Sequence, residues 1–261
     1  FVKYSTKAYQ YGFSSTMTYM NDWFFMPLFM FGWLPIIYYT KVRSIPEYFE
    51  KRFNKTARYL ATTMTLLYML GYIAIQLLTL ATALYRIYNI PLMATVIIIA
   101  IATTIYMHFG GQTSVIFTDL FQGLILLFAG LLLFALGLEY LGGGQFSIGI
   151  SYFWNYLTPE QKLPLAHFNH PPNFNFVGIF WQDGIAGSIG FLFLNQGLIM
   201  RFMAAKNVNE GRKAAAFNVL FVLPISAIVV SNAGWIGRAI ANGMPGILPV
   251  DLQPNDVFVA V

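Results

Sequence analysis

The chain has 261 residues with a mean hydropathy of +0.62; 57% of them are hydrophobic and 10% are charged. About a quarter of the residues in a soluble domain are charged, so this composition does not describe a soluble globular protein. The chain has no cysteine, which excludes disulfides, thiolate metal sites and cysteine nucleophiles, and its net charge of +5 comes from membrane-flanking loops, so it does not indicate nucleic-acid binding.

Apolar runs long enough to cross a bilayer, which takes about 20 residues, recur along the chain. They lie at about 18–40, 57–84, 91–108, 115–138, 176–200 and 214–237. The sequence therefore predicts an all-α polytopic membrane protein with about six spans, in which 1–261 forms a single transmembrane domain. The first stretch is too polar to span and a new apolar run begins at the end, so we interpret the chain as an internal portion of a longer protein.

The loops between these runs differ in charge. Segments 41–58 and 201–213 are rich in lysine and arginine, whereas Lys162 is the only such residue in 141–175. Cytoplasmic loops carry an excess of basic residues, so we predict that the first two segments are cytoplasmic and the third is an external loop. Six alternating crossings satisfy this assignment, with a turn at Gly110–Ser114 also inside.

The first span holds Tyr19 and Asp22 near its predicted outer end. An ionisable side chain within a bilayer faces a cavity or a partner, while one at the boundary is simply solvated, and position alone leaves both interpretations open. Pro27 and Pro35 each remove a backbone hydrogen bond, so we expect this helix to kink.

The second span places Tyr68, Tyr72 and Gln76 at i, i+4 and i+8, which is one face of a helix. This face is either the hydrogen-bonding wall of a solute site or a contact between helices, where such bonds contribute about 0.6 kcal/mol each. The spacing alone slightly favours the contact.

Asp119 enters the fourth span near its start, beside Thr118. A carboxylate within a span costs roughly 2.5–3.5 kcal/mol on insertion scales, so it marks an ion pathway unless it caps the helix at the membrane boundary. Both interpretations are open at this stage.

The fifth span contains small and polar residues at close spacing, namely Gly184, Gly187, Ser188, Gly190, Asn195 and Gln196. Small residues at this spacing allow close helix packing, which is the commoner explanation. The same pattern also suits a helix that unwinds within the membrane and exposes its backbone to a ligand.

The sequence lacks the motifs of the common hydrolases and nucleotide-binding enzymes: it has no Gly-x-Ser-x-Gly, no His-Glu-x-x-His and no phosphate-binding loop. His167 and His170 lie in a polar loop beside Pro171, a setting more typical of a loop than of a metal site. We therefore expect that the protein is not an enzyme.

Three stretches carry a family resemblance. They are Ile45–Phe53 (IPEYFEKRF), Gly110-Gly111 with Thr118–Gln122, and Asn195-Gln196 followed by Arg201–Asn207. Together they resemble the solute:sodium symporter family, which includes bacterial sodium-coupled galactose, proline and sialic acid transporters. Their order and the polarity of the loops between them make the resemblance specific, and it covers essentially the whole chain.

The resemblance implies a ten-helix core of the leucine-transporter type, made of two inverted five-helix halves. The chain would hold the outer end of core helix 1, helices 2 to 7 and the approach to helix 8, so the family's main sodium site falls outside it. The resemblance also implies a sodium-coupling role for Asp119 and an inner gate at Phe191. The solute-facing positions that it implies are Tyr19, Asp22, Tyr68, Tyr72, Gln76 and Ser188.

Three of these positions depart from the sugar transporters of the family. Those transporters resemble this chain but have a carboxylate in place of Tyr19, an amide in place of Ser188 and a tyrosine in place of Phe191. The resemblance therefore does not identify the solute.

By this resemblance the protein is expected to be a secondary active symporter of the cell membrane, lying in lipid and most simply in a bacterial inner membrane. It would import a small polar solute (a sugar, an amino acid or a carboxylate) together with sodium by alternating access. The alternative is a solute-sensing receptor built on the same membrane scaffold and fused to a signalling domain outside this chain.

Overall fold

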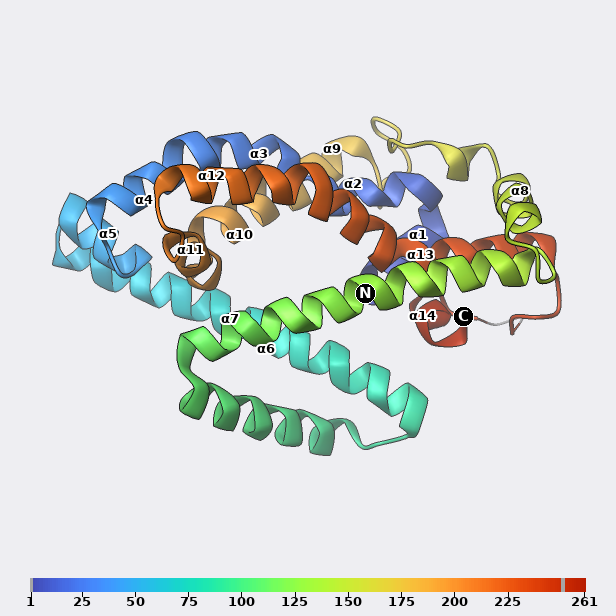
Figure 1. Ribbon diagram of the computed structural model, residues 1–261, viewed down its shortest axis with the longest axis horizontal. Coiled ribbons are helices and arrows are strands. Elements are labelled where there is room, and N and C mark those ends of the chain that lie inside the picture. The colour runs from blue at the N-terminus through green and yellow to red at the C-terminus, as the bar shows by residue number, and fades with distance from the viewer. Residues whose placement is uncertain (1, 250–251) are drawn as a thin grey trace. The chain divides into compact units, whose positions relative to one another are not determined.

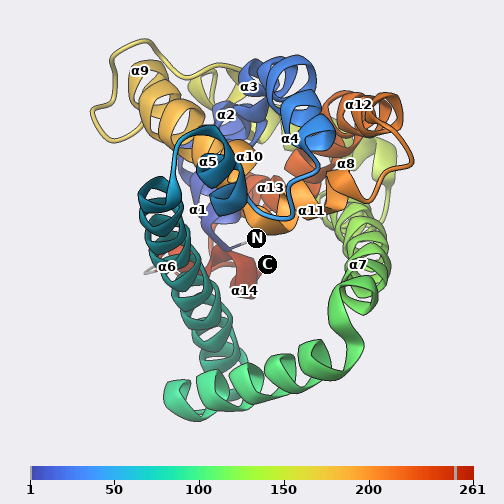
Figure 2. The ribbon, with the colours of Figure 1, turned by 90° about the vertical axis from the view of Figure 1, so that its left-hand side faces the viewer.

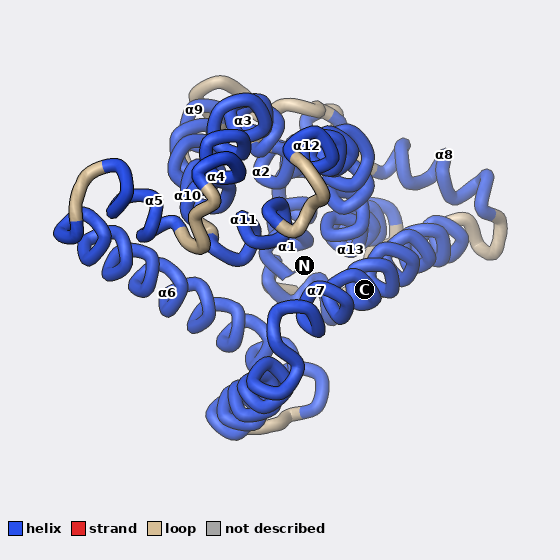
Figure 3. The backbone as a smooth tube through the Cα atoms, turned by 60° about the vertical axis from the view of Figure 1, so that its left-hand side comes forward, coloured by secondary structure: helices blue, strands red, loops and turns tan. Residues whose placement is uncertain are grey.

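The computed structural model describes residues 2–249 and 252–261, and this part of the chain consists of helices and loops (Figure 3). Six of its helical segments are long and apolar enough to cross a membrane. They are Lys3–Thr40, Lys55–Tyr88, Leu92–Gly111, Thr113–Leu141, Phe176–Leu194 and Val208–Gly243. The prediction of an all-α polytopic membrane protein is therefore confirmed.

Figure 1 labels the α-helices in chain order. They are α1 (Val2–Tyr11), α2 (Met17–Met20), α3 (Asp22–Leu28), α4 (Leu34–Thr40), α5 (Ile45–Arg52), α6 (Lys55–Tyr88), α7 (Leu92–Leu141), α8 (Phe146–Tyr156), α9 (Phe176–Ile179), α10 (Ile189–Leu194), α11 (Gln196–Met203), α12 (Val208–Phe217), α13 (Leu223–Gly243) and α14 (Val257–Ala260). The 3-10 helices are η1 (Gly12–Thr16), η3 (Glu160–Lys162) and η6 (Pro254–Asp256). The wider π-helices are η2 (Phe29–Trp33), η4 (Phe180–Ser188) and η5 (Asn218–Val222).

The π-helices interrupt three of the spans, and two of them lie next to prolines. Pro27 is inside α3 just before η2, Pro35 begins α4 just after it, and Pro224 begins α13 just after η5. Because proline has no N–H, the regular ladder of helical hydrogen bonds loses a member there, and a widened turn is one way to accommodate the loss. The interruption that the sequence predicts at Pro27 and Pro35 is therefore a π-helical turn.

The third and fourth spans are joined at Gly111. This residue has φ 60° and ψ −171°, whereas the rest of α7 continues as helix on both sides of it. A positive φ is readily adopted by glycine, which has no Cβ to clash with the backbone. The predicted turn at Gly110–Ser114 is therefore not a loop but a kink at Gly111 within a continuous run of helix.

The described residues divide into two compact units, and three of the four divisions fall inside a helix. Unit 1 comprises Phe1–Met20, Phe117–Trp181 and Phe221–Val261, and unit 2 comprises Asn21–Ile116 and Gln182–Leu220. The divisions fall between α2 and α3, within α7, within η4 and within η5. Three of the four therefore fall at or next to residues where the regular α-helix is interrupted.

Unit 1 is built around α13, which packs along α1 (Figure 1) and also contacts α8. Among the described residues, Trp235 is the largest fully buried side chain, and it packs with Ala8, Leu138 and Phe153. Gly234 lies so close to the backbone of α1 that an added Cβ would collide with it. The absence of a side chain at Gly234 therefore sets the approach of the two helices.

Unit 2 has its main apolar cluster around α3, η2 and α10, where Met26, Phe29, Leu34, Leu192 and Ala215 are buried together. Helix α12 packs against α4 and η2, and Figure 2 shows α3, α4 and α12 side by side. The core of this unit therefore joins the first, fifth and sixth spans.

The short helix α5 lies between the first two spans. Ser44 caps it by accepting a hydrogen bond from the N–H of Glu47 at 3.3 Å. The Glu47 carboxylate in turn accepts from the N–H of Arg43 at 2.8 Å and pairs with Lys51 at 3.2 Å. This reciprocal arrangement is close to a capping box, and it holds the loop before α5 against the helix.

Candidate functional site

The centre of the candidate site is the Asp22–Ser188 pair, in which two predicted solute-facing residues meet. Asp22 begins α3 and is partly buried, while Ser188 ends η4 and is 3% exposed. The Ser188 hydroxyl lies within hydrogen-bonding reach of the Asp22 carboxyl. Its oxygen also lies 3.3 Å from the carbonyl oxygen of Asp183, one π-helical turn back. The π-helix thus turns Ser188 toward the carboxyl group of another span.

Asn21, the residue before Asp22 in the sequence, carries an unused donor. The residue is 6% exposed, and its Nδ2 has no hydrogen-bond partner among the described residues. A buried donor without a partner costs about 1–3 kcal/mol, so native proteins rarely leave one unless a ligand or water completes it. The start of α3 and the end of η4 therefore provide an amide donor, a carboxylate and a hydroxyl within unit 2.

Helix α6 approaches the same span through Tyr68. The ring of Tyr68 lies 3.8 Å from where a Cβ on Gly190 would be, an ordinary van der Waals distance, so α6 and α10 are neighbours here. Tyr68 and Tyr72 stack along one helix face, with centroids 6.2 Å apart and ring planes at 26°. Tyr72 is 41% exposed and Gln76 is also exposed. The shared face is thus present, but only its Tyr68 end reaches the fifth span.

The predicted gate, Phe191, lies one helical turn beyond Ser188 on α10. Its ring is partly buried and packs against the cluster that contains Phe29 and Leu192. Phe191 therefore belongs to the apolar core of unit 2, and it follows Ser188 by three residues in the sequence.

The two remaining predicted residues belong to unit 1. The ring of Tyr19 meets that of Tyr4 edge-on, with centroids 4.9 Å apart. Asp119 is partly buried inside α7, well beyond Thr113, where its span begins. A capping residue precedes the first turn, so Asp119 does not cap this helix.

The fifth span matches neither sequence-based alternative completely. Its glycines lie in or beside η4, which remains helical, and the chain leaves the helix only at Asn195, where ψ is 103°. There the Asn195 side chain caps α11, accepting from Leu198 at 3.1 Å. Gly190 contacts Tyr68 only at an ordinary van der Waals distance, and the helix is widened over Phe180–Ser188 and broken at Asn195.

Sequence reasoning missed the side chains that bind the π-helices. The indole N–H of Trp23 donates to the carbonyl of Val219 in η5 at 2.9 Å, and Arg212 Nε donates to the carbonyl of Met30 in η2 at 3.1 Å. These partners are far apart in the chain, so no local pattern signals them. The one local signal is Trp23 directly after Asp22, because an indole N–H inside a span needs a hydrogen-bond acceptor.

A further contact that the sequence did not signal joins α11 to the loop before α5. Gln196 accepts from the N–H of Ile45 and donates to the carbonyl of Arg43, both at 3.0 Å. A single amide thereby holds the entry of α5 against the break at Asn195.

Within the described residues, no three His, Asp or Glu side chains are grouped as a metal site would require.

Comparison with known proteins identifies the family. The sequence profile of the sodium:solute symporter family matches residues 1–260. The sodium/glucose cotransporter of Vibrio parahaemolyticus is 30% identical over 205 residues, which are 76% of this chain and 37% of that protein. The human sodium-coupled monocarboxylate transporter 2 is 27% identical over 82% of this chain and 34% of its own length. A sodium/sialic acid symporter of Aliivibrio fischeri is 25% identical over 92% of this chain and 48% of its own length.

These relatives are transporters by name, not enzymes, and this chain spans between about a third and a half of their length. The match runs from one end of the chain to the other and includes the three stretches that carried the resemblance. The chain belongs to the sodium:solute symporter family.

Proposed function

We propose that the complete protein is a sodium-coupled secondary active symporter that takes up a small polar solute by alternating access. The observation that carries this proposal is the Asp22–Ser188 pair, a carboxyl and a hydroxyl brought together from two spans. Polar side chains inside spans mark pathways for solutes and ions, because lipid offers them no partner. The names of the relatives support the coupling to sodium.

The groups at this position favour a solute rich in hydroxyl groups or one with a cationic group. The Asp22 carboxylate accepts hydrogen bonds, the Asn21 amide donates one, and the Ser188 and Tyr68 hydroxyls do either. A solute that replaces the Ser188 hydroxyl at Asp22 would satisfy the carboxylate and the free donor of Asn21 together. Sugars, amino acids and carboxylates remain the solute classes to test.

Alternating access requires elements that have two arrangements. The π-helices η2, η4 and η5 are suited to this, because an inserted residue in a helix lets the turns beside it change register. We propose that a shift of η4 moves Ser188 with respect to Asp22 and carries Phe191 into or out of the inward path. Phe191 would then act as the gate on the cytoplasmic side.

Sodium coupling is proposed to involve Asp119. Each sodium ion that moves through about 100 mV releases roughly 2.3 kcal/mol, before any concentration gradient is counted. Coupling demands that sodium raise the affinity for solute, and the solute must then raise the affinity for sodium by the same factor. A carboxylate inside a span is a group that can sense the ion directly.

The test is uptake by the full-length protein in proteoliposomes, with an inward sodium gradient and a panel of sugars, amino acids and carboxylates. Asp22→Asn keeps the shape of the side chain but removes its charge, and it should lower uptake of the transported solute at least tenfold. Glu139→Gln, an exposed carboxylate near the end of α7, is the matched control and should leave uptake unchanged. Uptake that does not depend on sodium would refute the proposal.

A second variant tests the ion. Asp119→Asn should weaken the sodium dependence of uptake while solute binding at saturating sodium persists. If the sodium dependence of uptake stays as in the wild type, Asp119 has no part in coupling, whatever the fate of the Asp22 variant.

A further inference from the structure

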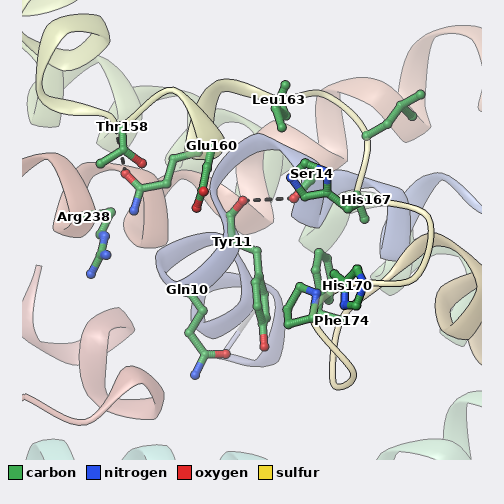
Figure 4. Close-up of a pocket in the computed structure, with 14 residues that line it drawn as sticks. Gln10, Tyr11, Ser14, Thr158, Glu160, Leu163, His167, His170, Phe174 and Arg238 are labelled. Atoms are coloured by element: carbon green, nitrogen blue, oxygen red, sulfur yellow. Dashed lines mark hydrogen bonds between the residues drawn. The ribbon is translucent and has the colours of Figure 1, made fainter.

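Unit 1 contains a polar cavity that the proposed transport site does not use. Its volume is about 390 Å³, and it lies among the end of α1, the loop from 158 to 174 and the last turns of α13 (Figure 4). Small-molecule sites have volumes of about 300–1,000 Å³. The charge of the loops predicts that all three segments are external, so the cavity would face the medium from which a solute arrives.

Hydrogen bonds and close contacts hold together the segments that surround this cavity. Trp235 donates its indole N–H to the carbonyl of Gly12 at 3.0 Å. Gly12 has φ +68°, and a Cβ there would collide with the backbone of Gln161. Asn242 donates to the carbonyl of Tyr156 at 2.8 Å and to the side chain of Gln161 at 3.2 Å. The cavity is therefore preformed, which lowers the entropy lost when a ligand binds.

One end of the cavity carries two opposite charges that are not paired with each other. Arg238 and Glu160 both line it, and neither forms an ion pair with any residue that the structure describes. Arg238 Nε is buried and has no acceptor in the described part of the chain, and the guanidinium lies 5.3 Å from the ring centre of Tyr9. A buried guanidinium nitrogen without an acceptor costs free energy that an incoming carboxylate would restore.

The other end is aromatic and partly apolar. Tyr11 and Phe174 stack with centroids 4.0 Å apart and planes at 8°, and both line the cavity with Leu163 and His170. Figure 4 shows Arg238 and Glu160 toward one side, with His170 and Phe174 toward the other. The cavity thus offers a charged end and an end that suits a hydrocarbon side chain.

We propose that this cavity binds a zwitterionic α-amino acid. Its carboxylate would lie on Arg238, whose planar guanidinium matches the two oxygens, and its ammonium group would lie on Glu160. Its side chain would run toward Phe174. This site shares no residue with the Asp22–Ser188 pair, so the proposal stands apart from the choice of transported solute.

The experiment measures binding to the full-length purified protein by calorimetry, with three matched probes. L-Leucine carries both charged groups, 4-methylpentanoate lacks the ammonium group, and 3-methylbutylamine lacks the carboxylate. We expect L-leucine to bind and each analogue to bind at least tenfold more weakly. Equal binding of 4-methylpentanoate would overturn the proposal, because it would indicate a site for anions in general.

Substitutions then locate the site. Arg238→Gln and Glu160→Gln should each weaken L-leucine binding at least tenfold, with Lys162→Gln, outside the cavity lining, as the control that leaves it unchanged. Arg238→Lys keeps the positive charge but lacks the planar guanidinium, so its affinity for L-leucine should be intermediate. An intermediate value would also show that weak binding by Arg238→Gln is not caused by misfolding. The Asp22→Asn variant should still bind L-leucine. Binding that is lost in Asp22→Asn but kept in Arg238→Gln and Glu160→Gln would refute this proposal and leave the transport proposal intact.

Discussion

Three buried side chains of unit 1 donate hydrogen bonds to backbone carbonyls of other elements, whereas at the start of α3 in unit 2 a buried amide is left without a partner among the described residues. In unit 1, Ser5 donates to the carbonyl of Val230, Asn232 to that of Gly130 and Trp235 to that of Gly12, at 2.9, 2.6 and 3.0 Å. In unit 2, the Asn21 amide has no partner among the described residues, and Asp22 meets a side chain.

This difference indicates which side chains are able to bind a ligand. A side chain that satisfies a neighbouring carbonyl fixes two helices together, and it has little left to offer a ligand. A side chain that pairs with another side chain, or with none, can exchange that partner for a solute. Unit 1 also has such a group in Arg238, whose Nε has no acceptor among the described residues, and Arg238 lines the cavity for which we propose a ligand.

The largest expected effect is the loss of the packed centre of unit 1. Trp235→Ala removes a side chain that is 2% exposed together with its hydrogen bond to Gly12, and it should lower the free energy of unfolding by about 3–5 kcal/mol. Trp181→Ala, at 62% exposure in the same unit, should cost under about 1 kcal/mol. Thermal unfolding of the detergent-solubilised protein measures both. Similar losses in the two variants would mean that unit 1 has no rigid centre.

The Asp22–Ser188 pair should give the next largest effect, and its effect should be on function. Ser188→Ala leaves Asp22 without its hydroxyl partner, which costs about 1–3 kcal/mol, so we expect roughly a tenfold change in solute affinity. Ser231→Ala, 2% exposed in unit 1, is the control for removing a buried hydroxyl and should leave solute affinity as it is.

A double-mutant cycle sharpens this test. Because the two groups are in contact, the effects of Asp22→Asn and Ser188→Ala on solute affinity should deviate from additivity by about 0.5–3 kcal/mol. Additive effects would show that the hydroxyl and the carboxyl act on the solute separately, and the pair would then not be a single site.

Two tryptophans of unit 2 test whether the π-helices depend on their side-chain partners. Trp23→Phe removes the hydrogen bond to Val219 but keeps most of the ring, and it should destabilise η5 by about 1 kcal/mol. Trp33→Phe is a matched control, since Trp33 Nε1 is buried without a partner in the described residues. Hydrogen exchange at the amides of 219–223 measures the difference. Equal exchange in the two variants would contradict the role given to Trp23.

The contrast between the units also explains what the sequence could predict. The spans follow from hydropathy, and the Ser44–Glu47 cap of α5 follows from a local pattern, because both depend on residues close together in the chain. The shared face of Tyr68 and Tyr72 was equally visible, since helical spacing fixes it.

What escaped prediction depends on residues far apart in sequence. The donation from Trp23 to Val219 and the clamp from Gln196 to Ile45 need the tertiary fold to bring the partners together. The π-helix η4 also changes which residues face inward, because each added residue rotates the following turn by about 100° relative to a regular helix. A helical wheel drawn for 176–200 would therefore misplace Ser188.

The smallest expected effect lies at the surface of unit 2, in the cap of α5. The N–H of Arg43 and the ammonium group of Lys51 hold the pKa of the Glu47 carboxyl below its ordinary value of 4.5. Since the folded state binds the proton less readily than the unfolded one, the cap stabilises the fold fully above about pH 4.5, and this contribution falls as pH drops through the folded pKa.

Glu47→Gln should therefore melt slightly below the wild type at pH 7, and the two melting temperatures should converge in acid. Glu210→Gln, on an exposed pair with Lys213, is the control that should keep the wild-type pH dependence. If Glu47→Gln and the wild type have the same melting temperature at every pH, the contacts of Glu47 add no net stability, as is usual for an ion pair exposed to solvent.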